Sequence, residues 1–168
     1  RPASVLAFSL LSTLLTAQES ALWLRQPAIS PDGNSIVFCY QGDLWRVPAA
    51  GGSAIALTTN AAYDSAPVWS PDGRMIAFAS TRFGSYDVFA MPSNGGAPTR
   101  LTFHSNGEQP TGFSPDGANV LFYGSRQDDV HNQQFPVGGL GELYSVPVKG
   151  GKPMQVSTIA MQRARYNS

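Results

Sequence analysis

Three short runs of apolar residues recur along the chain, and each follows a polar turn. The runs span residues 36–40, 75–79 and 120–123. Nearly every position in a run is apolar, which predicts short strands that are buried on both faces. A further apolar strand follows each run, at 44–47, 88–91 and 143–146. We therefore expect an all-β chain in which neighbouring sheets cover both faces of one another.

The tetrapeptide Ser-Pro-Asp-Gly precedes each apolar run, at 30–33, 70–73 and 114–117. Proline, aspartate and an exit glycine in this order predict a type I turn that joins two antiparallel strands. A Gly-Gly pair follows later in each repeat, at 51–52, 95–96 and 150–151. We expect each pair to form a type I′ hairpin turn, because both of its central residues need positive φ.

The tetrapeptides stand 40 and then 44 residues apart, which is the length of one four-stranded propeller blade. The predicted fold is all-β: a partial β-propeller with three four-stranded antiparallel blades plus the start of a fourth. The blades are expected at about 27–59, 67–103 and 110–158, and the fourth from about 161, within a propeller fragment at 27–168. Aligned on Pro67 and Pro110, the third repeat carries one extra residue. Three blades cannot close a ring, so an uncovered last face would be an aggregation hazard.

The N-terminus differs from the repeats. Residues 5–15 form a mostly apolar run that is too short for a membrane span, which needs about 20 residues. Its length and the small residue Ala17 indicate a signal peptide at 1–17, truncated at its start because no Met begins it, followed by a lead-in segment at 18–26. A buried helix is the alternative. We expect an exported protein, periplasmic or extracellular, with no membrane span after signal removal.

Composition excludes several functions. Eleven basic and eleven acidic residues give no net charge, so neither nucleic acid nor an anionic membrane is an expected partner. The single cysteine, Cys39, excludes an internal disulfide. It lies in an apolar run, which favours a small buried side chain over a reactive thiol.

Sequence variation is confined to one rim of the predicted blades. This rim, called the variable rim below, holds the connections from second to third strand and from blade to blade. The hairpin is Gln41–Gly42 in repeat 1, residues 83–86 in repeat 2 and residues 127–141 in repeat 3. Opposite charges flank the two longer loops, namely Arg82 with Asp87 and Arg126 with Glu142. We expect each pair to meet across its hairpin and contribute about 0.2–1 kcal/mol.

Loops on a rigid scaffold are the usual place for recognition, so the variable rim is the predicted contact surface. Each candidate residue alone is also compatible with a solvated loop. The candidate residues for peptide or partner contact are Tyr63, Asp64, His104, Glu108, Asp128, Asp129, His131 and Phe135. The Asp-Asp-x-His pattern within the long loop has no further ligand cluster, so we predict no metal and no cofactor.

No catalytic motif stands out in the chain. It has neither Gly-x-Ser-x-Gly nor His-Glu-x-x-His, and its Gly-Gly pairs sit in hairpins without the following helix that a phosphate site needs. We therefore expect no catalytic residue here.

The segment from Pro67-Val68-Trp69-Ser70-Pro71-Asp72-Gly73 through Arg100-Leu101-Thr102 resembles the WD40-like repeat of TolB-type periplasmic proteins. The same repeat occurs in the N-terminal propeller of tricorn-type proteases, and the resemblance covers residues 27–168. Three details favour tricorn-like serine peptidases: the segment 22–30 after the signal peptide, the segment 42–52, and the long insertion within 126–147.

The resemblance implies a parent protein with propellers, a PDZ-like module and a C-terminal serine-peptidase core that holds the nucleophile. No position of this chain matches that core. The implied role is to filter, guide or dock peptides, so the implied partners are peptide or protein substrates and the protein's own C-terminal protease domain; oligomerisation is left open. Two alternatives are a TolB-like periplasmic protein-binding propeller and an accessory propeller of an amidohydrolase or prolyl-oligopeptidase-type enzyme.

Overall fold

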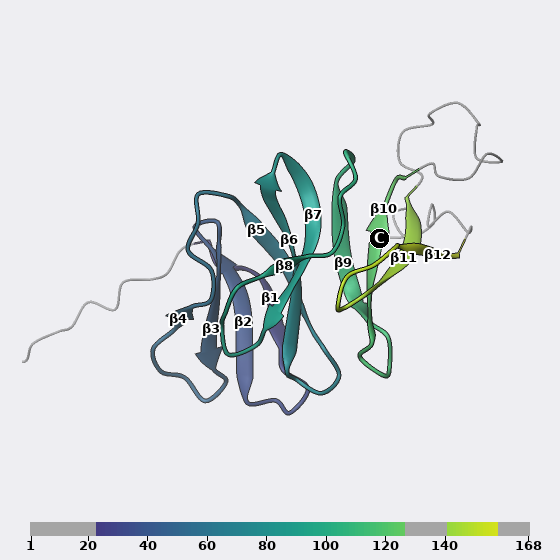
Figure 1. Cartoon of the computed structure of the whole chain (residues 1–168). Coiled ribbons are helices and arrows are strands. Elements are labelled where there is room, and N and C mark those ends of the chain that lie inside the picture. The colour runs from purple at the N-terminus through teal and green to yellow at the C-terminus, as the bar shows by residue number, and fades with distance from the viewer. Residues whose placement is uncertain (1–22, 127–140, 158–168) are drawn as a thin grey trace, which may run out of the picture.

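The computed structural model describes residues 23–126 and 141–157, which form three four-stranded antiparallel sheets standing side by side (Figure 1). Blade 1 consists of β1 (Arg25–Ile29), β2 (Ser35–Tyr40), β3 (Asp43–Pro48) and β4 (Ile55–Ala56). Blade 2 consists of β5 (Asp64–Trp69), β6 (Met75–Phe83), β7 (Ser85–Pro92) and β8 (Thr99–Arg100). Blade 3 consists of β9 (Glu108–Phe113), β10 (Asn119–Gly124), β11 (Glu142–Pro147) and β12 (Met154–Ser157). These sheets confirm the predicted partial propeller, whose expected fourth blade lies outside the described residues.

In each blade the strands are hydrogen-bonded in chain order, first to fourth. Sequential antiparallel pairing places the turns after the first and third strands on one rim, and the turns after the second strand on the other. Over its described ranges the chain has no helix long and apolar enough to cross a membrane.

The core lies between the blades. Ile76 and Phe78 of β6 pack in a cluster with residues of blade 1, whereas Ala77, between them, packs in a cluster with blade 3 residues such as Phe122. Successive side chains of a strand point to opposite faces, and both faces of β6 are covered. This double burial explains why the apolar runs show no alternation with polar residues.

The Ser-Pro-Asp-Gly turns have the predicted form. In the first, the Gly33 amide donates to the Ser30 carbonyl at 2.9 Å, and Gly33 has φ +73°. The Ser30 hydroxyl donates to Asp32 Oδ1 at 2.5 Å and accepts from the Ser35 amide at 2.9 Å. The same contacts recur around Ser70 and Ser114. The turn therefore carries its own hydrogen-bond network in all three blades.

The prediction of type I′ turns at the Gly-Gly pairs is wrong. In blade 1 the Gly51 amide donates to the Pro48 carbonyl at 2.9 Å, so Ala49 and Ala50 are the central residues, and neither has the positive φ of a type I′ turn. The glycines follow the turn, with φ +93° and +127°, and lead the chain towards β4. The tight turn with positive φ at both central residues is instead the hairpin of β2 and β3, at Gln41 and Gly42.

The extra residue expected in the third repeat is also absent. Strands β5 and β9 both have six residues and end directly before the turn serine. Counted back from that serine, Pro110 stands at the position of Ala66 rather than of Pro67. Both strands are the end strands of their sheets, where a residue without an amide hydrogen is tolerated at more than one position. Aligning the repeats on proline therefore misplaced them by one residue.

Candidate functional site

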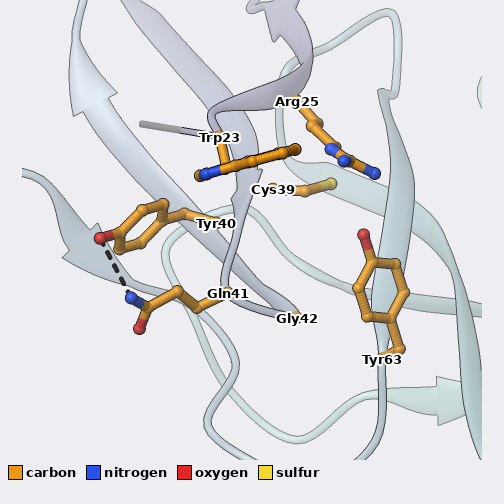
Figure 2. A pocket seen from close by; sticks show the side chains of 7 residues that line it. All are labelled: Trp23, Arg25, Cys39, Tyr40, Gln41, Gly42 and Tyr63. Carbon is orange, nitrogen blue, oxygen red and sulfur yellow. Dashed lines mark hydrogen bonds between the residues drawn. The ribbon is translucent and has the colours of Figure 1, made fainter. Parts of the chain in front are cut away.

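A pocket of about 560 Å³ opens on the variable rim, where the hairpin of blade 1 meets the segment leading into blade 2 (Figure 2). Its size falls within the range of about 300–1,000 Å³ that is usual for ligand sites. Its lining residues are Trp23, Arg25, Cys39, Tyr40, Gln41, Gly42 and Tyr63. Of the predicted contact residues that the structure describes, Tyr63 lines it.

The pocket combines aromatic walls with one cationic group. Figure 2 shows the rings of Trp23, Tyr40 and Tyr63 around the opening, and the Arg25 guanidinium carbon lies 5.3 Å from the Trp23 ring centre. The Tyr40 hydroxyl accepts a hydrogen bond from Gln41 Nε2 at 3.1 Å. Aromatic rings and arginine are the side chains most enriched at recognition sites. These side chains are thus suited to binding a ligand rather than to catalysing a covalent reaction.

Cys39 lines this pocket with an unreactive thiol. Its side chain is 2% exposed, and its Sγ donates to Gln26 Oε1 at 3.4 Å. Burial raises the pKa of the thiol to about 11, so it is neutral near pH 7. A neutral, enclosed thiol is a poor nucleophile, as expected for a structural cysteine.

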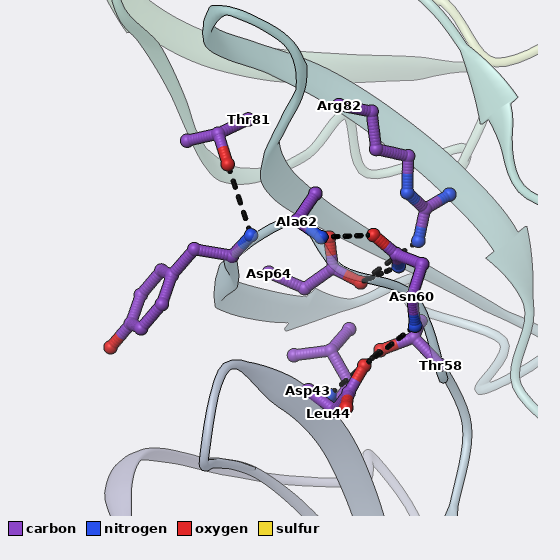
Figure 3. Close-up of polar contacts among 9 residues, drawn as sticks. Asp43, Leu44, Thr58, Asn60, Ala62, Asp64, Thr81 and Arg82 are labelled. Atoms are coloured by element: carbon purple, nitrogen blue, oxygen red, sulfur yellow. Dashed lines mark hydrogen bonds and ion pairs between the residues drawn. The ribbon is translucent and has the colours of Figure 1, made fainter.

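Tyr63 is placed by a network of hydrogen bonds in the connection between blades 1 and 2 (Figure 3). Its amide donates to Thr81 Oγ1 at 3.0 Å, and the residue is 40% exposed. Asn60 Oδ1 accepts from the backbone amide of Ala62 at 2.8 Å, and the backbone amide of Asn60 donates to Asp43 Oδ1 at 3.3 Å. The backbone under Tyr63 is therefore tied to both blades, while its ring remains accessible.

Two other predicted contact residues, Asp64 and Glu108, are buried in ion pairs instead of facing solvent. Asp64 is fully buried, and its Oδ2 lies 2.8 Å from Arg82 Nη2 (Figure 3). Glu108 is 1% exposed, and its Oε1 lies 2.6 Å from Arg126 Nε. Both carboxylates hold the start of a first strand against the end of the second strand.

The predicted pairing of Arg82 with Asp87 is therefore wrong. Arg82 binds Asp64, and Asp87 Oδ2 lies 2.7 Å from Nη2 of Arg100 on strand β8. Burial raises the pKa of Asp87 despite the opposing effect of Arg100. In blade 3 the arginine of the second predicted pair, Arg126, binds Glu108 in the same manner as Arg82 binds Asp64.

Each of these arginines also lies over two aromatic rings. Arg82 lies 5.5 and 5.2 Å from the ring centres of Phe78 and Phe89. Arg126 lies 5.3 and 5.5 Å from those of Phe122 and Tyr144. A planar guanidinium can stack on rings while its edge reaches a carboxylate. The sequence held a signal for this pairing: in both repeats the acid lies six residues before the turn serine and the arginine twelve residues after it.

His104, another predicted contact residue within the described ranges, does not line the pocket. His104 is half-buried, its Nδ1 accepts from the Asn106 amide at 3.1 Å, and its carbonyl accepts from the Ser85 hydroxyl at 3.1 Å. Asp128, Asp129, His131 and Phe135 lie outside the described residues. Within the described part of the chain, no three His, Cys, Asp or Glu side chains are grouped as metal ligands.

Comparisons with known proteins now bear on this arrangement. A family model described as the tricorn protease N-terminal β-propeller domain matches residues 21–168. The chain belongs to this family. No curated protein sequence gives a significant match to this member of the tricorn N-terminal propeller family.

Solved structures share the fold of this tricorn-type propeller. A protein assigned as TolB from Agrobacterium tumefaciens is 26% identical with a TM-score of 0.66, covering 80% of this chain and 46% of that one. TolB from Acinetobacter baumannii is 21% identical with a TM-score of 0.59, covering 79% and 32%. The tricorn protease is 26% identical with a TM-score of 0.55, covering 73% and 12%. The chain thus spans less than half the length of each of these structures.

Proposed function

We propose that this chain is the non-catalytic N-terminal propeller of an exported tricorn-like serine peptidase. In this role it filters, guides or docks peptides for a C-terminal protease core. The observation that carries the proposal is the family match over residues 21–168. The apolar run at residues 5–15 supports export.

The structure supports a binding role through the variable rim. The pocket there is formed by loops held on paired strands, and Tyr63 is fixed by its backbone while its ring is accessible. Loops on a rigid scaffold suit peptide recognition. The proposal assigns the nucleophile to the C-terminal core and gives this chain substrate handling alone.

The test is to read the parent gene beyond Ser168 and assay the full-length protein for casein or peptide hydrolysis. We expect hydrolysis that a serine-directed inhibitor abolishes and that residues 1–168 alone do not perform. A full-length protein that has no downstream catalytic domain and hydrolyses nothing would contradict the peptidase proposal.

A second candidate function is a TolB-like binding propeller that contacts protein partners in the periplasm. The 26% identity and TM-score of 0.66 with the TolB structure from Agrobacterium tumefaciens favour it. It predicts that the parent gene ends soon after the propeller, and that the purified protein binds partner proteins without cleaving them.

A further inference from the structure

Among the described residues, Arg25 differs from the other arginines in having no oxygen partner there. Arg82, Arg100 and Arg126 lie 2.6–2.8 Å from a buried carboxylate. Arg46 Nη1 donates to the Ser93 carbonyl at 2.8 Å, and Arg74 Nε lies 3.8 Å from Asp72 Oδ2. Within the described residues, the contact that Arg25 makes is with the ring of Trp23.

The repeat pattern shows that blade 1 lacks the ion pair found at this rim in the other two blades. Blades 2 and 3 each place a buried acid six residues before the turn serine and its arginine twelve residues after. The pairs are Asp64 with Arg82, and Glu108 with Arg126. The same two positions of blade 1, counted from Ser30, are Leu24 and Gly42. Blade 1 therefore has neither member of the pair at this rim.

The short hairpin of blade 1 leaves space in the same place. Its β2 and β3 have six residues each and are joined by two, whereas β6 and β7 of blade 2 have nine and eight residues. Gly42 has φ +92° and contributes no side chain, and a Cβ there would lie 3.5 Å from the Tyr63 ring. The pocket is thus the recess left where blade 1 is shorter than its neighbour.

The charge of this recess favours an anion. Among the described lining residues Arg25 is the one with a charged side chain, because the Cys39 thiol is neutral. The nearby carboxylate of Asp64 is already bound by Arg82 at 2.8 Å and Asn60 at 3.2 Å. A guanidinium presents a fork of donors that matches a carboxylate. Its neighbours Trp23 and Tyr63 offer apolar surface beside that charge.

The exposure of the walls indicates how a ligand would enter. Trp23 is 73% exposed and Tyr63 is 40% exposed, so the recess stays open at the rim. An open recess with aromatic walls can admit a side chain from a polypeptide that runs across it. The chemistry that fits is an acidic side chain next to an apolar one.

We propose that the recess formed by Trp23, Arg25, Gln41 and Tyr63 binds an Asp or Glu side chain of an extended peptide, with Arg25 pairing the carboxylate and Trp23 and Tyr63 contacting an adjacent apolar residue. The inference rests on the proposed peptide-handling function and specifies the substrate class: acidic-apolar segments. It gives blade 1 a selective role at the rim.

The experiment measures binding to the full-length protein with its hydrolytic activity blocked by a serine-directed inhibitor. The probes are two short peptides, acetylated and amidated so that neither end is charged, with a central Leu-Asp or Leu-Asn. We expect the Asp peptide to bind about tenfold more tightly than its Asn twin at low salt, and the difference to shrink as salt screens the pair. Arg25→Gln should abolish the difference, and Arg25→Lys should keep part of it.

The matched control is Arg74→Gln, which removes an exposed arginine on the opposite rim and should leave the difference intact. Equal affinity of both peptides for the unmodified protein would overturn the proposal, as would a difference that survives Arg25→Gln. Preferred binding of a peptide with a free C-terminus and no acidic side chain would overturn it too. Inhibitor-sensitive hydrolysis is scored separately, so either the pocket or the peptidase proposal can fail while the other stands.

Discussion

At the scale of single residues, the buried ion pairs dominate the variable rim. Asp64 is fully enclosed, and Arg82 is both stacked on two rings and bonded to the carboxylate. Taking two charges out of water costs free energy that the pair must recover through its geometry. Losing one partner is therefore far more harmful than losing both.

Arg82→Met should destabilise the propeller by about 3–5 kcal/mol, because it leaves the Asp64 carboxylate buried without its cation. The double variant Asp64→Leu with Arg82→Met should recover most of this loss. Urea unfolding of the full-length protein, followed at the propeller's transition, measures both. A double variant as unstable as the sum of the single ones would show that the two residues do not act as a pair.

The aspartates of the Ser-Pro-Asp-Gly turns give a pH-dependent contribution. Hydrogen bonds from the Ser30 hydroxyl and from Asn34 lower the pKa of Asp32 from 3.8 to about 2. A carboxyl whose pKa is lower in the folded state stabilises the fold above its unfolded pKa, and this contribution disappears as the pH falls through the folded value. For Asp32 the loss occurs between about pH 4 and pH 2.

Asp32→Asn should therefore lower the thermal midpoint at pH 6 and reduce the further drop between pH 4 and pH 2. The amide keeps an acceptor oxygen for the turn but cannot titrate, which isolates the charge. Thermal unfolding across this pH range makes the measurement, with Lys152→Gln, at an exposed position of blade 3 away from these turns, as a control. An unchanged acid limb would mean that the turn carboxylate contributes nothing to the pH dependence.

At the scale of the strand, the blades could be predicted from the sequence because burial on both faces of a strand requires a continuous run of apolar residues. Strand β6 is covered on both faces, so its apolar run has no alternation, and the blades follow from that run and the turn motif. The partners in the ion pairs were harder to predict from the sequence. Arg82 stands closer in sequence to Asp87 than to Asp64, and only the pairing of β5 with β6 brings Asp64 near it. The pocket was missed because the predicted first blade begins at residue 27, after Trp23 and Arg25, whereas the structure begins β1 at Arg25.

Phe78→Ala tests the contribution of the double-sided core. The ring of Phe78 is fully buried between blades 1 and 2 and stacks on Phe89 with centres 5.7 Å apart. Its removal should cost about 3–5 kcal/mol, as for other large-to-small changes in well-packed cores. Phe83→Ala is the comparison variant: Phe83 is 62% exposed but also stacks on Phe89, so its removal should cost less than that of Phe78 in the same unfolding assay. Equal losses would mean that the core between the blades does not hold the sheets together.

At the scale of the whole molecule, specific hydrogen bonds join neighbouring blades in addition to the apolar core. Gln26 Oε1 accepts from the Ala66 amide at 2.8 Å, and Trp69 Nε1 donates to the Ala28 carbonyl at 3.0 Å. On the rim of the Ser-Pro-Asp-Gly turns, Arg46 Nη1 donates to the Ser93 carbonyl at 2.8 Å. These contacts connect both rims of blade 1 to blade 2, so the recess beside Arg25 rests on a firmly joined pair of sheets.

On the variable rim, the length of a hairpin loop does not determine how many residues of its two strands pair. Strands β2 and β3 pair over six residues and are joined by two, while β10 and β11 also pair over six residues although residues 125–141 lie between them. Loop closure adds only about 0.6 kcal/mol for each doubling of loop length. The Gln41–Gly42 turn is consequently a suitable insertion site. A loop inserted there would change which ligands the recess admits without changing the strand pairing of blade 1.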